Sequence, residues 1–261
     1  MEICKLCGLL SKLSKSHIIP NSFIRKVKSK SGGKTLFSTG NQSKVISNFD
    51  PKEKLLCSSC EHLLNTNYEK DGINVFRDKH SVIKNRDHIV FKNINYEKFY
   101  LFLLSIFWRA SISSIDFYKN IYLPESLNNQ MRQCLQKNTL KPLDGGKVRI
   151  DQLVKISLFR LKDKTGKCPQ IILDKTLSEP MVQIDNTING IIWFICIHGF
   201  LVVYSIPIGK DAHEYRFKKL KSQLTDLNIQ RFEVLDINSI SVLRDAFSMM
   251  NPESIGLKIK N

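Results

Sequence analysis

The sequence predicts a protein of the α+β class, in which an N-terminal metal-stabilised domain is followed by helices and then by a C-terminal domain with an antiparallel hairpin. Three observations predict this order. Two Cys-x2-Cys pairs lie near the N-terminus, apolar residues recur at helical spacing over residues 96–115, and short β-branched and aromatic runs follow residue 148. We therefore expect a zinc-binding domain over 1–92, a helical connector over 93–144 and an α+β domain over 145–261, the last beginning in a Gly-Gly linker.

The two cysteine pairs predict one structural zinc site. Cys4 and Cys7 form the first pair, and Cys57 and Cys60 form the second. Each pair can bend into a knuckle that directs two thiolates at one ion, and four sulfurs complete the tetrahedral shell that structural zinc prefers. A single pair could be chance or a redox motif, but two pairs beside Gly and Ser turn residues favour a shared zinc. Because about 50 residues separate the pairs, a folded element must occupy the gap.

The gap and the segment after it have recognisable local patterns. The string Ser16-His17-Ile18-Ile19-Pro20 predicts a short strand with a histidine at its head and a proline that ends it. A short basic helix is expected over 22–28, and extended segments are expected at 36–37 and 45–46. A further helix is expected from Ser58 to Lys70, beginning at the second cysteine pair.

This combination resembles the HNH, or ββα-metal, endonucleases, which are treble-clef proteins. That family nests a β-hairpin between two zinc knuckles, carries a histidine in a His-Ile-Ile-Pro-like string on the first strand, and starts its helix at the second knuckle. The resemblance covers roughly residues 1–75. It implies a metal-dependent hydrolase of phosphodiester bonds in nucleic acid, with DNA favoured as the substrate. It also implies that His17 is the general base and that the four-cysteine zinc does no chemistry.

The helix after the second knuckle is where the resemblance implies a catalytic Mg²⁺ or Mn²⁺. Glu61, Asn65 and Glu69 are spaced by four residues and are expected on one helical face. Two carboxylates and an amide suit a hard divalent ion. The structural alternative is that Ser58 and Glu61 form a capping box and that Glu69 is a solvated charge. His62 is kept as a reserve ligand.

A second function class remains open at this stage. The family usually places an Asp or a His immediately before the strand histidine, as a ligand of the catalytic metal, and here that position is Ser16. This substitution favours a non-catalytic, zinc-stabilised nucleic-acid-binding protein. A zinc-built adaptor for protein partners is a third possibility, and in that case the basic charge would be incidental.

The charge balance indicates a polyanionic partner. The chain has 40 Lys and Arg against 24 Asp and Glu, a net charge of +16. Such an excess strengthens binding to nucleic acid, although a lysine-rich composition can also leave a merely solvated basic surface. The basic residues nearest the histidine strand are the candidates for phosphate contacts: Lys15, Arg25, Lys26 and Lys28.

The remaining cysteines and the N-terminus indicate the cytoplasm. Cys134, Cys168 and Cys196 stand alone and are expected to be free, buried thiols. No signal peptide is recognised before Cys4, so a reducing cytosol fits the free thiols. The apolar run over 188–208 is long enough for a membrane span. Its β-branched and aromatic composition and a central His198-Gly199 instead predict a buried hairpin, so no membrane association is expected.

The middle and the end of the chain predict secondary structure but no catalytic or metal-binding residues. The apolar stripe over 96–115 covers most sides of its helix, and Arg109 within it is expected to pair with an acid or to cover a knuckle. A role for 145–261 in contacting a protein partner or positioning nucleic acid is possible, and the oligomeric state is not predicted. The other expected elements are helices at 124–137, 212–227 and 239–250, and strands at 148–150, 153–161, 171–173 and 181–184.

Overall fold

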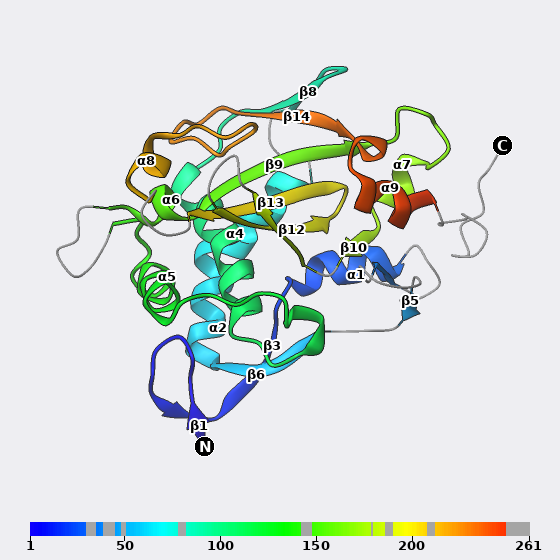
Figure 1. Cartoon of the computed structure of the whole chain (residues 1–261). Helices are drawn as coiled ribbons and strands as arrows, with labels where there is room; N and C mark the ends of the chain where they lie inside the picture. The colour runs from blue at the N-terminus through cyan, green and yellow to red at the C-terminus, as the bar shows by residue number, and fades with distance from the viewer. Residues whose placement is uncertain are drawn as a thin grey trace.

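The protein combines one large sheet with helices packed beneath it and a small unit at the far end (Figure 1). This unit, formed by residues 1–17 and 52–64 around the four cysteines predicted to bind zinc, is called the metal-site unit. It is therefore of the mixed α+β class that the sequence predicts. The computed structural model describes residues 1–29, 35–38, 45–47, 51–77, 82–141, 148–178, 180–185, 190–207 and 212–248. The predicted linker at 144–147 lies outside this range.

The large sheet has ten strands, drawn from almost the whole length of the chain. β10 pairs with β4 in parallel, as does β14 with β9, and the other neighbours are antiparallel. β11 (Met181–Asp185) pairs with β12 off the main path. Along that path the order is β5 (Val45–Ser47), β4 (Thr35–Ser38), β10 (Thr176–Ser178), β12 (Gly190–Ile197), β13 (Phe200–Pro207), β9 (Lys155–Lys162), β14 (Gln230–Asp236), β8 (His88–Phe91) and β7 (Val82–Lys84).

The predicted hairpin is confirmed as the centre of this sheet. β12 and β13 pair from Gly190 opposite Pro207 to Ile197 opposite Phe200, which leaves a two-residue turn. Its residues His198 and Gly199 have φ values of 52° and 75°. Two positive φ angles are the signature of the turn that best continues the twist of a hairpin.

A small hairpin, a separate two-stranded sheet and ten helices complete the regular structure of the described residues. β1 (Glu2–Ile3) pairs with β2 (Leu10–Ser11), and β3 (Leu13–His17) pairs with β6 (Lys52–Cys57). Two 3-10 turns lie at Asp116–Tyr118 and Ile237–Ser239. The helices are α1 (Asn21–Ser29), α2 (Ser58–Leu64), the π-helix η1 (Asn65–Glu69), α3 (Lys70–Phe76), α4 (Tyr96–Ser111), α5 (Glu125–Lys137), α6 (Ile150–Leu153), α7 (Gln170–Leu173), α8 (Ala212–Phe217) and α9 (Ser241–Ser248).

Three predicted elements are wrong. The expected strand at 171–173 is instead the helical turn α7, which begins directly after Pro169. The Ile172 amide donates to the Pro169 carbonyl and closes the first turn of this helix. A short apolar run does not distinguish a strand from a buried helical turn. The expected strand at 148–150 instead leads into α6. The expected helix over 212–227 ends at Phe217, and the segment after it is built of turns.

Helix α4 is the centre of the core. Thirteen of its sixteen residues are buried, as its wide apolar stripe predicts. On the side facing the sheet, the Phe107 ring stacks on Tyr204 with centroids 4.3 Å apart, and the Tyr204 hydroxyl donates to the Leu103 carbonyl over 3.0 Å. Phe102 packs near Phe23 of α1, which leads away from the metal-site unit. Figure 1 shows α4 between the sheet above and α2, β3 and β6 below.

Strands from different parts of the chain share the large sheet. β8 pairs with β14, and β4 pairs with β10, so the expected first and last domains contribute adjacent strands. The larger buried cluster likewise runs from Cys4 to Phe232. The boundaries at 92 and 144 stay a prediction. No helix in the described part of the chain combines the length and apolar character needed to cross a lipid bilayer.

A glycine in α3 allows α3 and α4 to approach closely. A Cβ atom at Gly72 would overlap the Phe102 ring of α4. We expect Gly72→Ala to lower the free energy of unfolding by about 1–3 kcal/mol, because overpacking forces a buried ring to move. Urea denaturation measures this, with Lys70→Ala as the matched control, since Lys70 is exposed in the same helix. An unchanged urea midpoint for Gly72→Ala would show that Gly72 of α3 is not in close contact with Phe102 of α4.

Candidate metal centre and strand–helix junction

The first cysteine pair lies on a tight knuckle between β1 and β2. The Cys4 amide donates to the Leu9 carbonyl over 3.0 Å, and the Gly8 amide donates to the Cys4 carbonyl over 2.8 Å. Gly8 has a φ of +78°, which a residue with a side chain rarely adopts. This turn brings Cys4 and Cys7 to the same side of the loop.

The second pair lies where β6 runs into α2. Cys57 is the last residue of the strand and occupies the N-cap position of the helix, and Cys60 lies in the first helical turn. The knuckle is fixed to this junction through its backbone, since the Lys5 amide donates to the Leu55 carbonyl over 2.9 Å. Arg132 of α5 also donates to the Leu6 carbonyl, over 3.1 Å.

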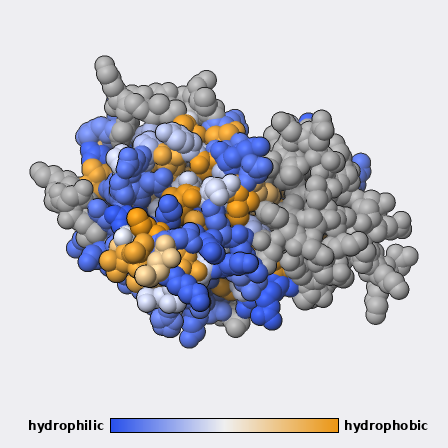
Figure 2. Space-filling model, turned by 90° about the horizontal axis from the view of Figure 1, so that it is seen from below, coloured by the Kyte–Doolittle hydropathy of each residue, from blue (hydrophilic) through white to orange (hydrophobic). Residues whose placement is uncertain are grey.

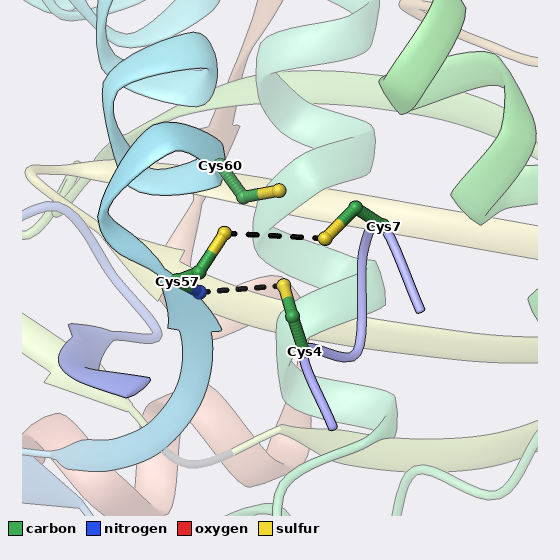
Figure 3. Close-up of side chains that lie close together, drawn as sticks. All are labelled: Cys4, Cys7, Cys57 and Cys60. Atoms are coloured by element: carbon green, nitrogen blue, oxygen red, sulfur yellow. Dashed lines mark hydrogen bonds between the residues drawn. The ribbon is translucent and has the colours of Figure 1, made fainter. Parts of the chain in front are cut away.

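The four sulfurs converge on one point (Figure 3). All lie within 4.8 Å of one another, and the Sγ atoms of Cys7 and Cys57 are 3.9 Å apart. Sulfurs about 2.3 Å from a tetrahedral zinc would be separated by about 3.8 Å, so the spacing fits that ion. The Cys57 amide also donates to the Cys4 Sγ over 3.3 Å. The predicted group of four is thus present, and it could hold a metal ion such as zinc.

The electrostatics of the cysteine group favour a bound cation. Burial raises the pKa of the Cys4 thiol, but hydrogen bonds from the backbone amides of Cys7, Cys57 and Leu6 outweigh it and lower the pKa to about 7. Burial and the neighbouring thiols raise the pKa of Cys60. Four thiols in contact therefore do not ionise together unaided, and a divalent ion would remove their mutual repulsion.

The two-stranded β3–β6 sheet carries the predicted histidine. In its antiparallel register Lys15 lies opposite Lys54, Ser16 opposite Glu53, and His17 opposite Lys52, with an irregularity between residues 14 and 15. Alternation places Ser16 on the inner face, where it is fully buried, and Lys15 and His17 on the outer face. The order along the chain is thus the knuckle, β3 with the histidine, then α1, β4 and β5, and finally β6 and α2 with the second cysteine pair.

The outer face of this two-stranded sheet is more basic than the sequence analysis assigned. Lys52 and Lys54 are exposed and lie beside His17 and Lys15. Like charges directly opposite each other on paired strands are destabilising without a counter-charge. Lys54 reaches Glu2 at 3.5 Å, but both groups are more than half exposed and the pair is weak. The alternation Lys-Glu-Lys over 52–54 was the signal that could have identified this face.

On the inner face, the strand is joined to the helix by a direct hydrogen bond. The Ser16 hydroxyl donates to Glu61 Oε1 on α2. Burial raises the pKa of the Glu61 carboxyl, and Ser16 and nearby Arg109 oppose that shift, whereas nearby Glu69 adds to it. Glu61 and Glu69 therefore lie within electrostatic range of each other, as the predicted face requires.

Glu69 forms an ion pair with a buried arginine of α4. Arg109 Nη2 lies 2.9 Å from Glu69 Oε1, and the two side chains are only 1% and 15% exposed. Arg109 also donates to the His17 carbonyl over 2.7 Å and to the Ser105 carbonyl over 3.2 Å. The expectation that Arg109 pairs with an acid is confirmed, and its contact with the histidine strand is an additional finding.

The other predicted site residues are more dispersed. Asn65 is exposed, and its backbone amide donates to the Glu61 carbonyl as in a regular α-helix. The π-helix η1 begins at Asn65, so its wider turns change the spacing between Asn65 and Glu69. His62 is exposed, and its ring contacts the Thr66 hydroxyl at 3.4 Å. Glu61, Asn65 and Glu69 as a ligand set for Mg²⁺ or Mn²⁺ stay a prediction. Among the described residues, the cysteines are the group of three or more potential ligands that converges.

The remaining candidates have different surroundings. His17 is half-buried, and its Nε2 atom is enclosed by protein. Lys15 and Arg25 are exposed and free to meet solvent or a partner. The side chains of Lys26 and Lys28 lie outside the described residues. Figure 2 views the molecule from below and shows apolar residues among hydrophilic ones on this face. Ile3, Leu9 and Leu10, near the first cysteine pair, are exposed apolar residues.

Comparisons with protein-family models, with curated proteins and with solved structures each give no match to this chain. The chemistry of the cysteine group and of the strand–helix junction is therefore the basis for a functional assignment.

The cysteine group gives a direct test of metal binding. We expect purified protein to contain one zinc per chain, and Cys57→Ser to lose it, because three thiolates hold the ion less tightly than four. Metal content measured by mass spectrometry, together with thermal melting, checks this. The melting temperature should also fall, since metal binding contributes to folding.

The matched control is Cys134→Ser, which alters another buried cysteine outside the group. It should keep its zinc even if it loses some stability. Full zinc content in Cys57→Ser would contradict a four-cysteine site.

Proposed function

We propose that the chain is an HNH-like, metal-dependent endonuclease that cleaves phosphodiester bonds of nucleic acid, with DNA the favoured substrate. The observation that carries the proposal is the strand–helix junction. The Ser16 hydroxyl joins the histidine strand to Glu61, and Arg109 joins the same strand to Glu69. Along the chain, His17 lies between the two cysteine pairs and Glu61 and Glu69 follow the second pair, which is the order that the resemblance to HNH nucleases implies.

In the proposed reaction His17 is the general base. It accepts a proton from a water molecule as the water oxygen attacks phosphorus and the bond from phosphorus to the 3′ oxygen breaks. A well-placed base contributes on the order of 10²–10⁴-fold. A bound Mg²⁺ or Mn²⁺ would stabilise charge on the phosphate and on the leaving oxygen.

Glu61 is the favoured carboxylate for that divalent ion. Glu69 already neutralises the buried Arg109, so its removal to an ion would leave an unpaired buried charge. Glu61 has only a hydroxyl partner from Ser16 and carries a raised pKa from burial, so a cation nearby would stabilise its charged form. The zinc held by the four cysteines has a closed shell and serves to fix the junction.

The outer face of β3 and β6 is the proposed phosphate contact. Lys15, Lys52 and Lys54 surround His17 on this face, and their exposed ammonium groups would lie along a nucleic-acid backbone. The net charge of +16 strengthens such binding over the whole molecule.

A non-catalytic, zinc-stabilised nucleic-acid binder is the second candidate. The observation that favours it is the same Ser16–Glu61 hydrogen bond. The resemblance implies that an ion bridges the strand and the helix at this point, and here a hydroxyl spans the gap directly. Such a protein would keep the basic face and the zinc but would have no general-base chemistry.

The role of His17 is tested with supercoiled DNA and with RNA, each with and without Mg²⁺ or Mn²⁺. We expect nicking that requires the divalent ion and that falls at least 100-fold in His17→Ala. Zinc content and melting temperature should stay at the parent values. His88→Ala, which alters a histidine on the distant strand β8, should cleave normally.

Three results would decide between the candidates. Full cleavage by His17→Ala removes the general-base assignment. Salt-sensitive binding without cleavage by the parent protein favours the non-catalytic binder. If the parent protein neither cleaves nor binds nucleic acid, both the endonuclease and the non-catalytic binder are excluded.

The basic face has its own test. We expect Lys15→Gln with Lys54→Gln to weaken DNA binding and to reduce the slope of log affinity against log salt by up to about one per lysine removed. Fluorescence anisotropy over a salt series measures both quantities. The control is Lys164→Gln with Lys167→Gln, two exposed lysines in the turn after β9. Equal losses in the two double variants would mean that binding is spread over the whole surface.

A further inference from the structure

An open pocket lies at the end of the molecule away from the cysteine group, where α6 and α8 meet the segment after α8 (Figure 1). Its volume is about 560 Å³. Small-molecule sites typically measure about 300–1,000 Å³, so the pocket is large enough for a compound of nucleotide size. It shares none of its lining residues with the strand–helix junction.

The lining of the pocket is strongly cationic. Five basic side chains face two carboxylates, an excess of three positive charges. Both carboxylates form ion pairs with the same arginine, since Arg149 lies 2.7 Å from Asp151 and 3.1 Å from Asp226. The other four basic residues of the lining are Lys155, Arg216, Lys219 and Arg231.

Three of these cations have no acidic partner. Within the described part of the chain, no carboxylate forms an ion pair with Arg216, Lys219 or Arg231. The Nε atom of Arg216 is buried and has no hydrogen-bond acceptor among the described residues. A buried donor without an acceptor destabilises the protein. The Arg216 guanidinium carbon lies 5.6 Å from the centroid of the Phe217 ring, and no carboxylate neutralises it among the described residues.

The loop that forms one wall of the pocket, residues 224–230, is held in place by hydrogen bonds within the protein. The buried Gln230 amide donates to the carbonyls of Thr225 and Leu227, and its oxygen accepts from the Thr225 amide. The Leu224 amide donates to the Ile156 carbonyl of β9 over 2.9 Å. A ligand would therefore meet an ordered loop, which lowers the entropic cost of binding.

We propose that this pocket binds a nucleotide that carries a diphosphate or triphosphate. The excess of three positive charges complements a polyphosphate better than a single carboxylate. Inorganic phosphate would leave most of the volume to water, whereas Leu220, Leu224 and Leu227 offer apolar surface to a nucleoside. This assignment does not depend on the proposed nuclease activity.

Calorimetric titration of the full-length, zinc-containing protein with ATP, without added divalent ions, tests the assignment. We expect saturable binding of one ATP per chain. Arg216→Gln should weaken the affinity at least about tenfold, because a charged hydrogen bond to phosphate is lost. Lys219→Gln should weaken it as well, and it alters an exposed residue that the fold does not need. The control Lys167→Gln should bind ATP like the parent.

The remaining outcomes overturn the proposal. No binding of ATP, or parent-like binding by both pocket variants, shows that the pocket is not a nucleotide site. Equal affinity for pyrophosphate and for ATP removes the nucleoside from the assignment. If a short DNA oligonucleotide binds in a manner sensitive to Arg216→Gln while ATP does not, the pocket belongs to nucleic acid instead. Melting temperature and zinc content confirm that each variant is folded.

Discussion

The convergence of four sulfurs from two distant segments is the constraint on which the rest of the metal-site unit depends. Cys57 ends a strand and starts a helix, while Cys4 and Cys7 come from a separate loop. Holding these sulfurs within 4.8 Å fixes the knuckle against β6 and therefore fixes the register of β3 beside it. Ser16 reaches Glu61 of α2 from that strand. A metal ion held by all four thiolates would contribute position rather than reactivity.

A second constraint comes from the buried Arg109. Its guanidinium is almost fully enclosed and contacts the histidine strand, helix α4 and Glu69 at once. Breaking such a buried pair by removing one partner typically costs about 3–5 kcal/mol. Because α4 also packs against the sheet through Phe107, Arg109 connects the metal-site unit to the main core. The orientation of His17 therefore depends on packing more than 90 residues further along the chain.

The sequence patterns were sufficient for the elements with strong local signals. Paired cysteines, the hairpin around His198-Gly199 and the apolar stripe of α4 each carry their own evidence, and all three are present. The basic face was missed in part because Lys52 and Lys54 join it only through the register with β3. The π-helix over Asn65–Glu69 was not predicted, because a four-residue repeat of polar side chains does not distinguish it from a regular α-helix. The cationic pocket unites residues from 96 to 231, which no local pattern could bring together.

The route of the chain between the two cysteine pairs has a consequence for how the molecule could be divided. After His17 the chain leaves the β3–β6 sheet, contributes β4 to the large sheet beside β10, and returns to form β6. An excised N-terminal fragment would therefore expose bare strand edges, which favour self-association. Such a fragment could still coordinate its ion and yet precipitate, so insolubility of a truncated form would reflect missing neighbours rather than a failed metal site.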